Sequence, residues 1–484
     1  MHPISTADIQ ARIERDNPWW SHPEKTIPEA LYGRRVYFKL FKTLALNFSV
    51  KRAAILLGPR RVGKTVMAKQ LIHDAITAGI DPHAILYASI DAPIYSGTPL
   101  ERFLGYMPKD IKGKNRLIIF DEIQYLKDWQ RHLKDLVDTY PNVKFVATGS
   151  AAAALRLKSR ESGAGRFSHF MLPPLTFYEF LEFSNDDKKL IFTDSDNAYR
   201  IKDIDALNER FIDYLNFGGY PEAVMNPDVR RNAEQYIRSD IVDKVLLKDL
   251  PSLYGIQEIP ELNRLFSVLA YNAGNEASLE NLAQSSGISK PTITKYIQYL
   301  ESAFLVIKLS TVDDNCRTLT RERNFKIYLS NPSMRSALFA PVKSSDTELI
   351  GKLTECAIFS QLQHSVDFSK LRYARWKNRQ SEGEVDVVFL GGPAQSPIWA
   401  GEVKWSDRLD SDFSRQTRSL EYFANKHKKL RETFFTTKTL HKTSTLADRK
   451  MHIFPSAYYC YAVGRNITSE LAEVPETIAI DASI

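Results

Sequence analysis

A short glycine-containing stretch constrains this chain more than any other feature. Five apolar residues, Ala53 to Leu57, predict a buried strand. The next eight positions fit the pattern G-x-x-x-x-G-K-[ST] without a mismatch: Gly58, Pro59, Arg60, Arg61, Val62, Gly63, Lys64 and Thr65. Apolar residues at helical spacing follow. The stretch therefore predicts a phosphate-binding loop (P-loop) between a strand and a helix.

Each part of this loop suits a nucleoside triphosphate. Glycines let backbone N–H groups approach phosphate oxygens closely, and the N-terminus of the following helix attracts the same anion. Lys64 would place a positive charge beside the β and γ phosphates, and the Thr65 hydroxyl would coordinate Mg²⁺. We therefore expect ATP and Mg²⁺ as cofactors.

The composition of the chain excludes several other classes of protein. The chain has 484 residues, 43% of them hydrophobic and 25% charged, as in multidomain globular proteins. The net charge of +7 is compatible with a nucleic-acid partner but does not establish one. No apolar run reaches the roughly 18 residues of a membrane span, so we expect a cytoplasmic protein. A zinc finger or disulfide framework is not expected, because the three cysteines lie far apart: Cys316, Cys356 and Cys460.

A second nucleotide motif lies downstream. An apolar run ending at Phe120 leads into Asp121 and Glu122, which is a Walker B pattern. Asp121 would hold the water shell of Mg²⁺, and Glu122 would polarise the attacking water. Buried strands often end in acids, so the pattern gains weight only from its position after the P-loop, with one predicted strand between them.

Two further residues are candidates for nucleotide chemistry. The predicted strand 143–147 ends in a Thr-Gly-Ser turn, where Ser150 would sense the γ-phosphate unless the turn is only structural. Arg166, with Arg160 in reserve, precedes the next predicted strand. It would complete the site of a neighbouring subunit in a homo-oligomer, or act on its own site in a monomer, unless it is a plain surface arginine.

Strands that alternate with helices predict a doubly wound parallel sheet with nucleotide at the carboxyl ends of the strands. The strand between the two Walker motifs, together with Glu122, favours the additional-strand ATPases over nucleotide kinases. Mixed-charge helical sequence then follows. It includes a tight turn at Gly218-Gly219 and predicts a helical lid.

These motifs together resemble a known family. GPRRVGKT, FDEIQ, TGS, a following Gly-Arg, PLTFYEF, GGYPEAV and an early NPWW are similar to prokaryotic AAA-type ATPases of the archaeal-ATPase kind. Those proteins carry a C-terminal domain of unknown function. The resemblance covers nearly the whole chain and implies an AAA-type ATPase.

Residues 278–300 have a helix-turn-helix layout, with a turn at Gly287 and a cap at Ser289. Two strands after it, at 304–309 and 325–329, would complete a winged helix. The second helix would offer Lys290, Thr292 and Lys295 to a DNA groove. The wing adds basic residues, although interdomain packing is the alternative role: Arg317, Arg321, Arg323 and Lys326.

The C-terminal part contains a possible second catalytic site. Asp386, followed by Glu402-Val403-Lys404 on a later strand, resembles the D-x(n)-E-x-K centre of restriction-endonuclease-like nucleases. Asp386, Glu402 and the Val403 carbonyl would hold one or two Mg²⁺ ions, Lys404 would orient the attacking water, and Glu355 matches the acid on the first helix of that core. A ladder salt bridge between Glu402 and Lys404, or an idle nuclease-like fold, would explain the same residues.

The sequence thus predicts an α/β multidomain protein with six segments. We expect a helical segment at 1–50, an AAA-type core at 51–180, a helical lid at 181–257, a winged helix at 258–345, a restriction-endonuclease-like α/β/α domain at 346–465 and a tail at 466–484. The expected function is an ATPase acting on DNA with a Mg²⁺-dependent nuclease domain. An ATP-gated DNA- or protein-binding switch and a protein-remodelling ATPase are the alternatives.

Overall fold

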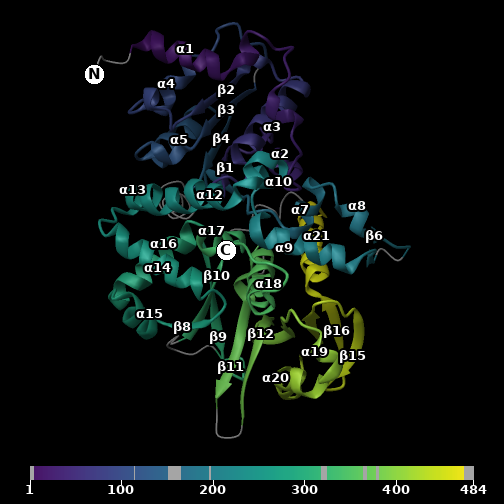
Figure 1. The fold of residues 1–484 in the computed structure, drawn as a ribbon. Coiled ribbons are helices and arrows are strands. Elements are labelled where there is room, and N and C mark those ends of the chain that lie inside the picture. Colours follow the sequence, from purple (N-terminus) through teal and green to yellow (C-terminus); the bar gives the residue numbers. More distant parts are fainter. Residues whose placement is uncertain are drawn as a thin grey trace. The chain divides into compact units, whose positions relative to one another are not determined.

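The computed structural model describes residues 5–113, 115–150, 165–195, 198–317, 324–363, 368–377 and 381–473, with side chains as far as Ile467. The chain divides into two compact units (Figure 1). Among the described residues, unit 1 comprises those up to Pro173 together with 468–473, and unit 2 comprises Pro174–Ile467. None of the helices in the described part of the chain has the length and apolar character that a membrane span requires.

Unit 1 is built on a five-stranded sheet in the order β2-β3-β4-β1-β5, and every pair in it is parallel. Its central strands are buried apolar runs because helices cover both faces of the sheet. The strands are β1 (Ala53–Leu57), β2 (Ile85–Ser89), β3 (Arg116–Asp121), β4 (Val143–Gly149) and β5 (Phe167–Met171). The predicted parallel α/β sheet is confirmed.

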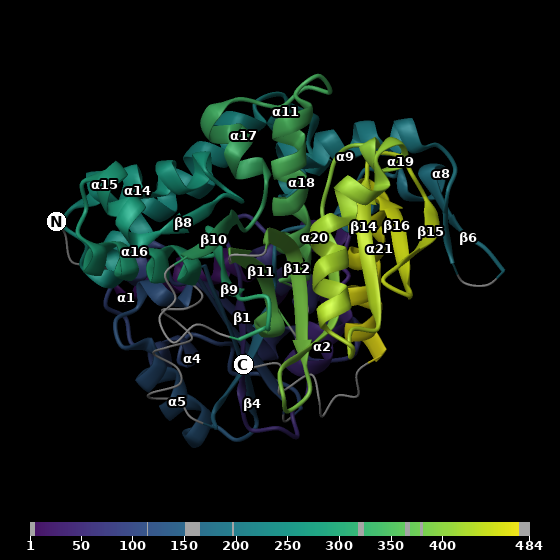
Figure 2. The same cartoon turned by 90° about the horizontal axis from the view of Figure 1, so that it is seen from below.

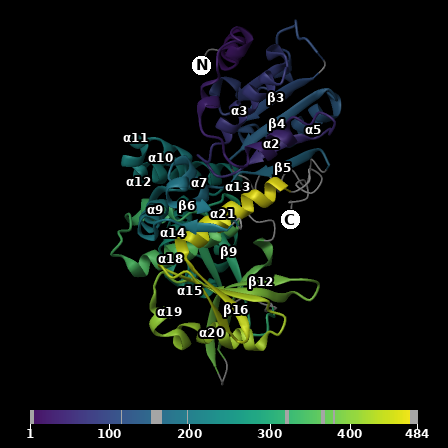
Figure 3. The same cartoon turned by 90° about the vertical axis from the view of Figure 1, so that its right-hand side faces the viewer.

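The helices of this sheet lie on opposite faces, as Figure 3 shows for α3 (Lys64–Thr77) and α5 (Trp129–Thr139). The shorter α4 (Leu100–Leu104) packs with α5. Strand β4 lies between β1, which leads into the P-loop, and β3, which ends in Asp121. The carboxyl ends of all three strands therefore meet at one edge of the sheet.

The N-terminal segment covers the free edge of β2. It forms α1 (Thr6–Asp16), a 3-10 turn η1 (Pro18–Trp20), a second turn η2 (Pro28–Leu31) and α2 (Phe38–Ala45). The Asn17 amide donates to Tyr87 O at 2.8 Å and accepts from Tyr87 N at 2.6 Å. Both indole N–H groups of the NPWW motif donate to Ile85 O, at 3.0 and 2.8 Å. These side chains occupy backbone groups that an edge strand otherwise leaves open.

Unit 2 begins with short helices and one small two-stranded ribbon. They are α7 (Phe177–Phe183), α8 (Asp187–Leu190), β6 (Ile191–Thr193), β7 (Tyr199–Ile201), α9 (Ile204–Phe217), α10 (Pro221–Met225), α11 (Pro227–Arg231), α12 (Ala233–Ile237), the π-helical η6 (Arg238–Asp243) and η7 (Val245–Asp249), and α13 (Leu250–Tyr254). The Gly218-Gly219 turn joins α9 to α10. A Cβ on Gly219 would lie 2.3 Å from the side chain of Asn331, so close packing requires glycine there.

The next part of unit 2 follows the helix-turn-helix prediction in its helices. Gly287, with φ +73°, ends the first of the two predicted helices, and Ser289 caps the second by accepting from Thr292 N at 3.4 Å. The elements are α14 (Ile259–Tyr271), β8 (Glu276–Ser278), α15 (Leu279–Ser286), α16 (Lys290–Ser302), β9 (Val306–Val312), β10 (Asn324–Leu329) and α17 (Ser333–Phe339).

The C-terminal part of unit 2 extends the same sheet. It contains α18 (Thr347–Leu362), η8 (Phe368–Lys370), β11 (Leu371–Lys377), β12 (Glu382–Gly391), β13 (Ser396–Glu402), α19 (Arg408–Ser411), α20 (Phe413–Lys426), β14 (Glu432–Thr437), β15 (Lys442–Leu446), β16 (Arg449–Pro455) and α21 (Ser456–Glu473). Helix α21 continues past residue 466, where we had expected a tail to start.

A single nine-stranded sheet runs through unit 2 in the order β15-β16-β14-β13-β12-β11-β9-β10-β8. Strand β11 pairs in parallel with β9, with Tyr373 opposite Thr311 and Ala374 opposite Val312. Figure 2 shows these strands side by side. The sheet therefore continues across the boundary that we had expected at residues 345 and 346.

Helices cover both faces of this sheet around β11 and β12. On one face, Trp376 belongs to the apolar core beneath α20 and stacks on Tyr422 with 5.1 Å between ring centroids. On the other face, α18 packs against β10, where Phe359 stacks on Tyr328 at 4.4 Å. The face beneath α18 also carries the charged cluster described below.

Candidate functional site

The P-loop lies between β1 and the first turn of α3, with each glycine needed for a different reason. A Cβ on Gly58 would lie 2.1 Å from the Leu172 carbonyl oxygen, so this position allows the loop to leave β1 against the end of β5. Gly63 has φ +98°, a conformation that favours glycine. The Lys64 ammonium donates to Gly58 O at 3.1 Å and Pro59 O at 2.7 Å, so it is folded back over the loop.

Three hydroxyl groups hold the carboxylate of Asp121, which is 2% exposed at the end of β3. Thr65 Oγ1 donates to Oδ2 at 2.8 Å, and Tyr87 OH donates to the same oxygen at 2.7 Å. Thr148 Oγ1 at the end of β4 donates to Oδ1. The carboxylate therefore has a fixed orientation next to the first turn of α3.

Glu122 adopts a left-handed backbone conformation with φ 51°, which is uncommon outside glycine and is concentrated at functional sites. Its N–H donates to Thr148 Oγ1 at 3.1 Å. The Gln124 amide donates to a Glu122 carboxylate oxygen and also to Ser150 Oγ, at 3.0 Å. Ser150 is thus connected to Glu122 through Gln124.

A second site lies under α18, and we call it the carboxylate–lysine cluster: Lys326, Glu355, Glu384, Asp386, Glu402 and Lys404. The Lys404 ammonium is 2.7 Å from Asp386 Oδ2 and 2.8 Å from Glu402 Oε2. The Val403 N–H also donates to Asp386 Oδ2, at 2.9 Å. Asp386 and Glu402 therefore converge on one cationic group.

Lys326 enters this cluster from β10, in the segment where we had expected a wing. Its ammonium lies 3.0 Å from Glu355 Oε1, 2.7 Å from Glu384 Oε1 and 3.7 Å from Asp386 Oδ1. The Tyr328 hydroxyl donates to the same oxygen of Glu355. The expectation that Lys326 adds positive charge to a DNA-facing wing was wrong, because its side chain is 4% exposed and paired with carboxylates.

A β-bulge in β12 accompanies this geometry. Between the pairs Arg372–Val388 and Ala374–Val385, β12 contains one more residue than β11, so the ladder is interrupted around Asp386. Bulges redirect side chains and are frequent next to active sites.

Burial and charge act in opposite directions on the carboxyl groups. Burial would raise the pKa of Asp386, but the ammonium groups of Lys404 and Lys326 outweigh it and hold that pKa below the ordinary value. Burial raises the pKa of Glu355 and raises that of Glu402 well above its ordinary value. Burial also disfavours charge on the two lysines, yet the surrounding carboxylates raise both of their pKa values.

The donor set of Asp386 and Glu402 fits a single Mg²⁺ ion. Mg²⁺ prefers oxygen ligands and is usually held by one or two carboxylates, with water and substrate phosphate completing its shell. Over the described residues, no group of three or more His, Cys, Asp or Glu side chains is arranged to hold a metal ion. The fit is therefore limited to two protein carboxylates.

Comparison with known families identifies the domain that contains the P-loop. Residues 50–181 match the model of an AAA domain. This chain carries a P-loop ATPase domain of the AAA type. The prediction of an AAA-type P-loop ATPase is thereby confirmed. Residues 208–346 match the model of a domain of unknown function.

Curated relatives are distant and uncharacterized. A protein of Methanocaldococcus jannaschii is 26% identical over 362 residues, which cover 72% of this chain and 75% of that protein. A protein of Haemophilus influenzae is 28% identical over 267 residues, covering 54% and 62% of the two chains. Both relatives are called uncharacterized, so these matches suggest no activity for the regions outside the AAA domain.

Several solved structures have some likeness to this chain. The Walker-type ATPase of Pyrococcus abyssi has a TM-score of 0.38 at 15% identity, over 65% of this chain and 97% of that one. Cdc6p of Pyrobaculum aerophilum scores 0.30 at 13% identity, over 69% and 96%. AMPPCP-bound DnaA of Aquifex aeolicus scores 0.28 at 16%, over 58% and 92%.

The AAA domain does not bring Arg166 to its own P-loop. Ala53 N donates to Arg166 O at 2.9 Å, so this arginine lies where β1 starts, whereas the loop follows the end of β1. Five residues of strand separate the two ends by about 16 Å. The Arg166 guanidinium pairs with Asp138 on α5 and is 44% exposed. Arg160 lies outside the described residues.

Sequence reasoning missed several contacts of the AAA domain. Thr148 and Gln124 lie inside the quoted TGS and FDEIQ motifs, so their positions carried a signal that we had attributed to neighbouring residues. Tyr87 had no such signal, because only the pairing of β2 with β3 brings it to Asp121. Arg35 was also missed; it is buried and donates to Val62 O at 2.8 Å and to Pro173 O at 2.9 Å.

The three residues that the sequence analysis assigned to the second helix of the helix-turn-helix lie on α16. Lys290 is exposed and pairs with Glu280 at 2.5 Å, and Lys295 is exposed. Thr292 is half-buried, with its hydroxyl 2.8 Å from that of Ser289. Arg321 and Arg323 lie outside the described residues.

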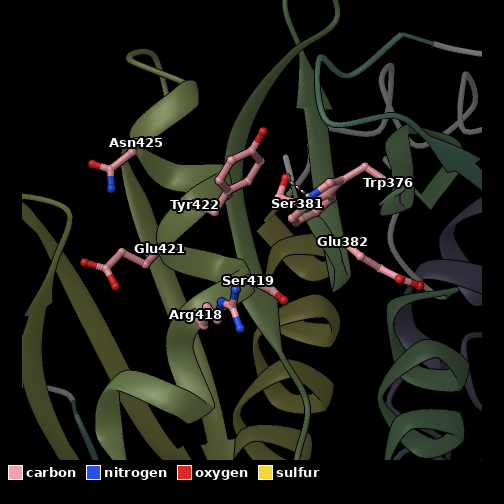
Figure 4. A pocket seen from close by; sticks show the side chains of 8 residues that line it. All are labelled: Trp376, Ser381, Glu382, Arg418, Ser419, Glu421, Tyr422 and Asn425. Carbon is pink, nitrogen blue, oxygen red and sulfur yellow. Dashed lines mark hydrogen bonds between the residues drawn. The ribbon is translucent and has the colours of Figure 1, made fainter. Parts of the chain in front are cut away.

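A separate hollow of about 360 Å³ lies between the start of β12 and α20 (Figure 4). The Trp376 indole N–H donates to Ser381 Oγ at 3.2 Å at its edge. None of the candidate site residues lines it. Its lining consists of Trp376, Ser381, Glu382, Arg418, Ser419, Glu421, Tyr422 and Asn425.

Proposed function

We propose that this protein is an ATP-hydrolysing enzyme that acts on DNA through a Mg²⁺-dependent nuclease site in unit 2. The arrangement around Asp121 is the observation that carries the hydrolysis proposal. Its carboxylate accepts from Thr65 at 2.8 Å, and Glu122 follows it directly in the chain. Thr65 and Asp121 would hold Mg²⁺, which supplies positive charge to the β and γ phosphate oxygens when bound.

Each residue of the AAA domain would then have one task. The loop N–H groups and Lys64 bind the phosphates, and Lys64 turns away from the carbonyls of Gly58 and Pro59 to do so. Glu122 takes a proton from the attacking water. Gln124 and Ser150 orient Glu122, which supports a role for Ser150 close to that of the sensor we had expected.

ATP binding and hydrolysis can be separated with two variants. We expect Lys64→Ala to lose ATP binding, because the loop loses the positive charge that would contact the phosphates. We expect Glu122→Gln to bind ATP with wild-type affinity but to hydrolyse it roughly 100-fold or more slowly, as for loss of a general base. Equilibrium binding of labelled ATP and phosphate release would measure the two steps.

Lys134→Ala, which removes an exposed lysine from α5, is the matched control and should behave as wild type. Wild-type hydrolysis by Glu122→Gln would refute the proposed role of Glu122.

The proposal that unit 2 acts on DNA rests on two element orders. The order α14-β8-α15-α16-β9-β10, with β10 between β8 and β9 in the sheet, supports a winged helix that offers Lys290 and Lys295. The order α18-β11-β12-β13-α20-β14 supports a restriction-endonuclease-like core. In it, Asp386 and Glu402 would bind Mg²⁺ and Lys404 would orient the attacking water.

Cleavage of labelled single- and double-stranded DNA tests the nuclease proposal. With Mg²⁺ or Mn²⁺ present, we expect the wild type to cut and both Asp386→Ala and Lys404→Ala to lose at least about 100-fold in rate, as for loss of a metal ligand or general base. Glu382→Ala removes an exposed acid at the start of the same strand and should cut normally. Parallel reactions with and without ATP would reveal whether the AAA domain gates cutting.

An ATP-gated binding switch is the second candidate function. It is favoured by the lysine ammonium groups that already lie between the carboxylates of the cluster. It predicts no cutting by the wild type, with DNA retained equally by wild type and Asp386→Ala. A homo-oligomer is part of either proposal, since Arg166 lies away from its own loop and could complete a neighbour's site.

A further inference from the structure

We propose that the carboxylate–lysine cluster binds one divalent cation and not two, because the Lys326 ammonium occupies the second cation position. This inference rests on the metal site of the proposed function but not on DNA cleavage. It concerns a residue that lies outside the expected nuclease core and that no sequence motif singled out as part of the site.

The cluster has two cation positions that share Asp386. The Lys404 ammonium lies between Asp386 Oδ2 and Glu402, at 2.7 and 2.8 Å. The Lys326 ammonium lies beside Asp386 Oδ1, at 3.7 Å, between Glu355 and Glu384. One carboxylate that directs its two oxygens to two different cations is the arrangement by which a carboxylate bridges a pair of metal ions.

The two lysines differ in how easily they can leave. The Lys404 side chain is 39% exposed, so its ammonium can turn toward solvent and leave Asp386 and Glu402 to a metal ion. The Lys326 side chain is 4% exposed, and its strand β10 is paired on both sides, with β9 and β8. The Tyr373 ring lies 5.3 Å from its ammonium and adds a cation–π contact.

Removal of Lys326 from its place would also take a cation away from three acidic groups, Glu355, Glu384 and Asp386. Glu384 would keep Arg375 at 2.8 Å and Asp386 would keep Lys404 at 2.7 Å. Glu355 contacts Lys326 and the Tyr328 hydroxyl, and a buried carboxylate is strongly disfavoured without compensation. Glu355 therefore acts as a positioning residue that holds Lys326, together with Tyr328, and is not a metal ligand. This assignment differs from the catalytic role that the sequence had predicted for Glu355.

Mn²⁺ binding to the full-length, nucleotide-free chain tests the inference directly. The electron paramagnetic resonance signal of free Mn²⁺ gives the number of ions bound per chain. We expect one for the wild type, none for Asp386→Ala and two for Lys326→Met, which removes the ammonium but retains all four carboxylates. Lys308→Met is the control: it removes a lysine from the neighbouring strand β9 and should leave one ion bound.

A destabilised Lys326→Met variant would still give an answer. We expect Mn²⁺ to raise its thermal midpoint much more than that of the wild type, because the ion replaces the lost charge. The double variant Lys326→Met, Glu355→Gln should lose this rescue. Two ions in the wild type, one ion in Lys326→Met or no rescue of an unstable variant would overturn the inference.

The nuclease proposal fails separately. A wild-type chain that binds one Mn²⁺ but cuts no DNA would refute the nuclease and leave the single-cation inference intact. A wild-type chain that cuts DNA but binds two Mn²⁺ ions would support the nuclease and overturn the single-cation inference. A wild-type chain that binds no Mn²⁺ without nucleotide would overturn both the inference and the metal site on which it rests.

Discussion

Tyr87 links the edge of the sheet in unit 1 to the carboxylate of Asp121. Its hydroxyl and that of Thr65 donate to the same oxygen, Oδ2. If the Thr65 hydroxyl turns to Mg²⁺, Tyr87 remains to hold that oxygen. The Lys69 ammonium lies 3.5 Å above the Tyr87 ring, and Asn17 clamps the backbone of the same residue, so the tyrosine has little freedom to move.

Tyr87→Phe should therefore slow ATP hydrolysis and leave ATP binding nearly unchanged. We expect kcat to fall roughly tenfold, which corresponds to about 1.4 kcal/mol and is close to the contribution of a hydrogen bond to a charged group. Higher Mg²⁺ concentrations should restore part of the rate. Tyr95→Phe is the control, because that hydroxyl contacts Asp16 at 3.4 Å and not Asp121. Wild-type kcat for Tyr87→Phe at limiting Mg²⁺ would contradict this role.

The residues that could be predicted are those whose neighbours in the chain define their task. Lys64 and Thr65 follow a glycine loop, and Asp121 follows an apolar run, so contiguous sequence was enough. Tyr87 and Lys326 lie inside ordinary strands. They reach a carboxylate only because another strand or helix, distant in the sequence, is packed beside theirs, and no local pattern records that contact.

For strands and helices too, the sequence predicts what depends on neighbouring residues and not what depends on distant ones. Continuous apolar runs predicted the strands of unit 1, and helical spacing of apolar residues predicted the two helices α15 and α16, because burial of apolar side chains is a local requirement. Strand pairing is not local. The parallel contact of β9 with β11 pairs Thr311 with Tyr373 although β10, α17 and α18 lie between them in the chain. Two apolar strands with similar patterns give no sign of which neighbour each will take.

Glycine positions show a related difference between sequence and structure. The Gly218-Gly219 pair was read as a tight turn, which is correct for the link between α9 and α10. Gly218 has no left-handed conformation, however, with φ −74°. The pair is required by close packing instead: a Cβ on Gly218 would lie 2.3 Å from the Tyr214 ring, and one on Gly219 would meet Asn331. The sequence shows the glycine but not the side chain that packs against it.

At the scale of the whole molecule, one nine-stranded sheet runs through the compact unit 2, although its sequence suggests several domains. The elements of the proposed winged helix supply β9 against the edge of β11 and supply Lys326 to the carboxylates of the proposed nuclease core. A fragment of residues 346–467 would lack both. Its β11 edge would be open to pairing with other chains, and Glu355, Glu384 and Asp386 would lose a cation.

We therefore expect the fragment 346–467 to be poorly folded, while the fragment 174–467 folds cooperatively. Breaking a buried ion pair by removal of one partner costs about 3–5 kcal/mol, and the open strand edge adds a tendency to aggregate. Urea unfolding followed by near-ultraviolet circular dichroism would compare the two fragments. A single cooperative transition of 346–467 with the same midpoint as 174–467 would show that the C-terminal elements form an autonomous domain, and that the shared sheet is only a contact between two domains.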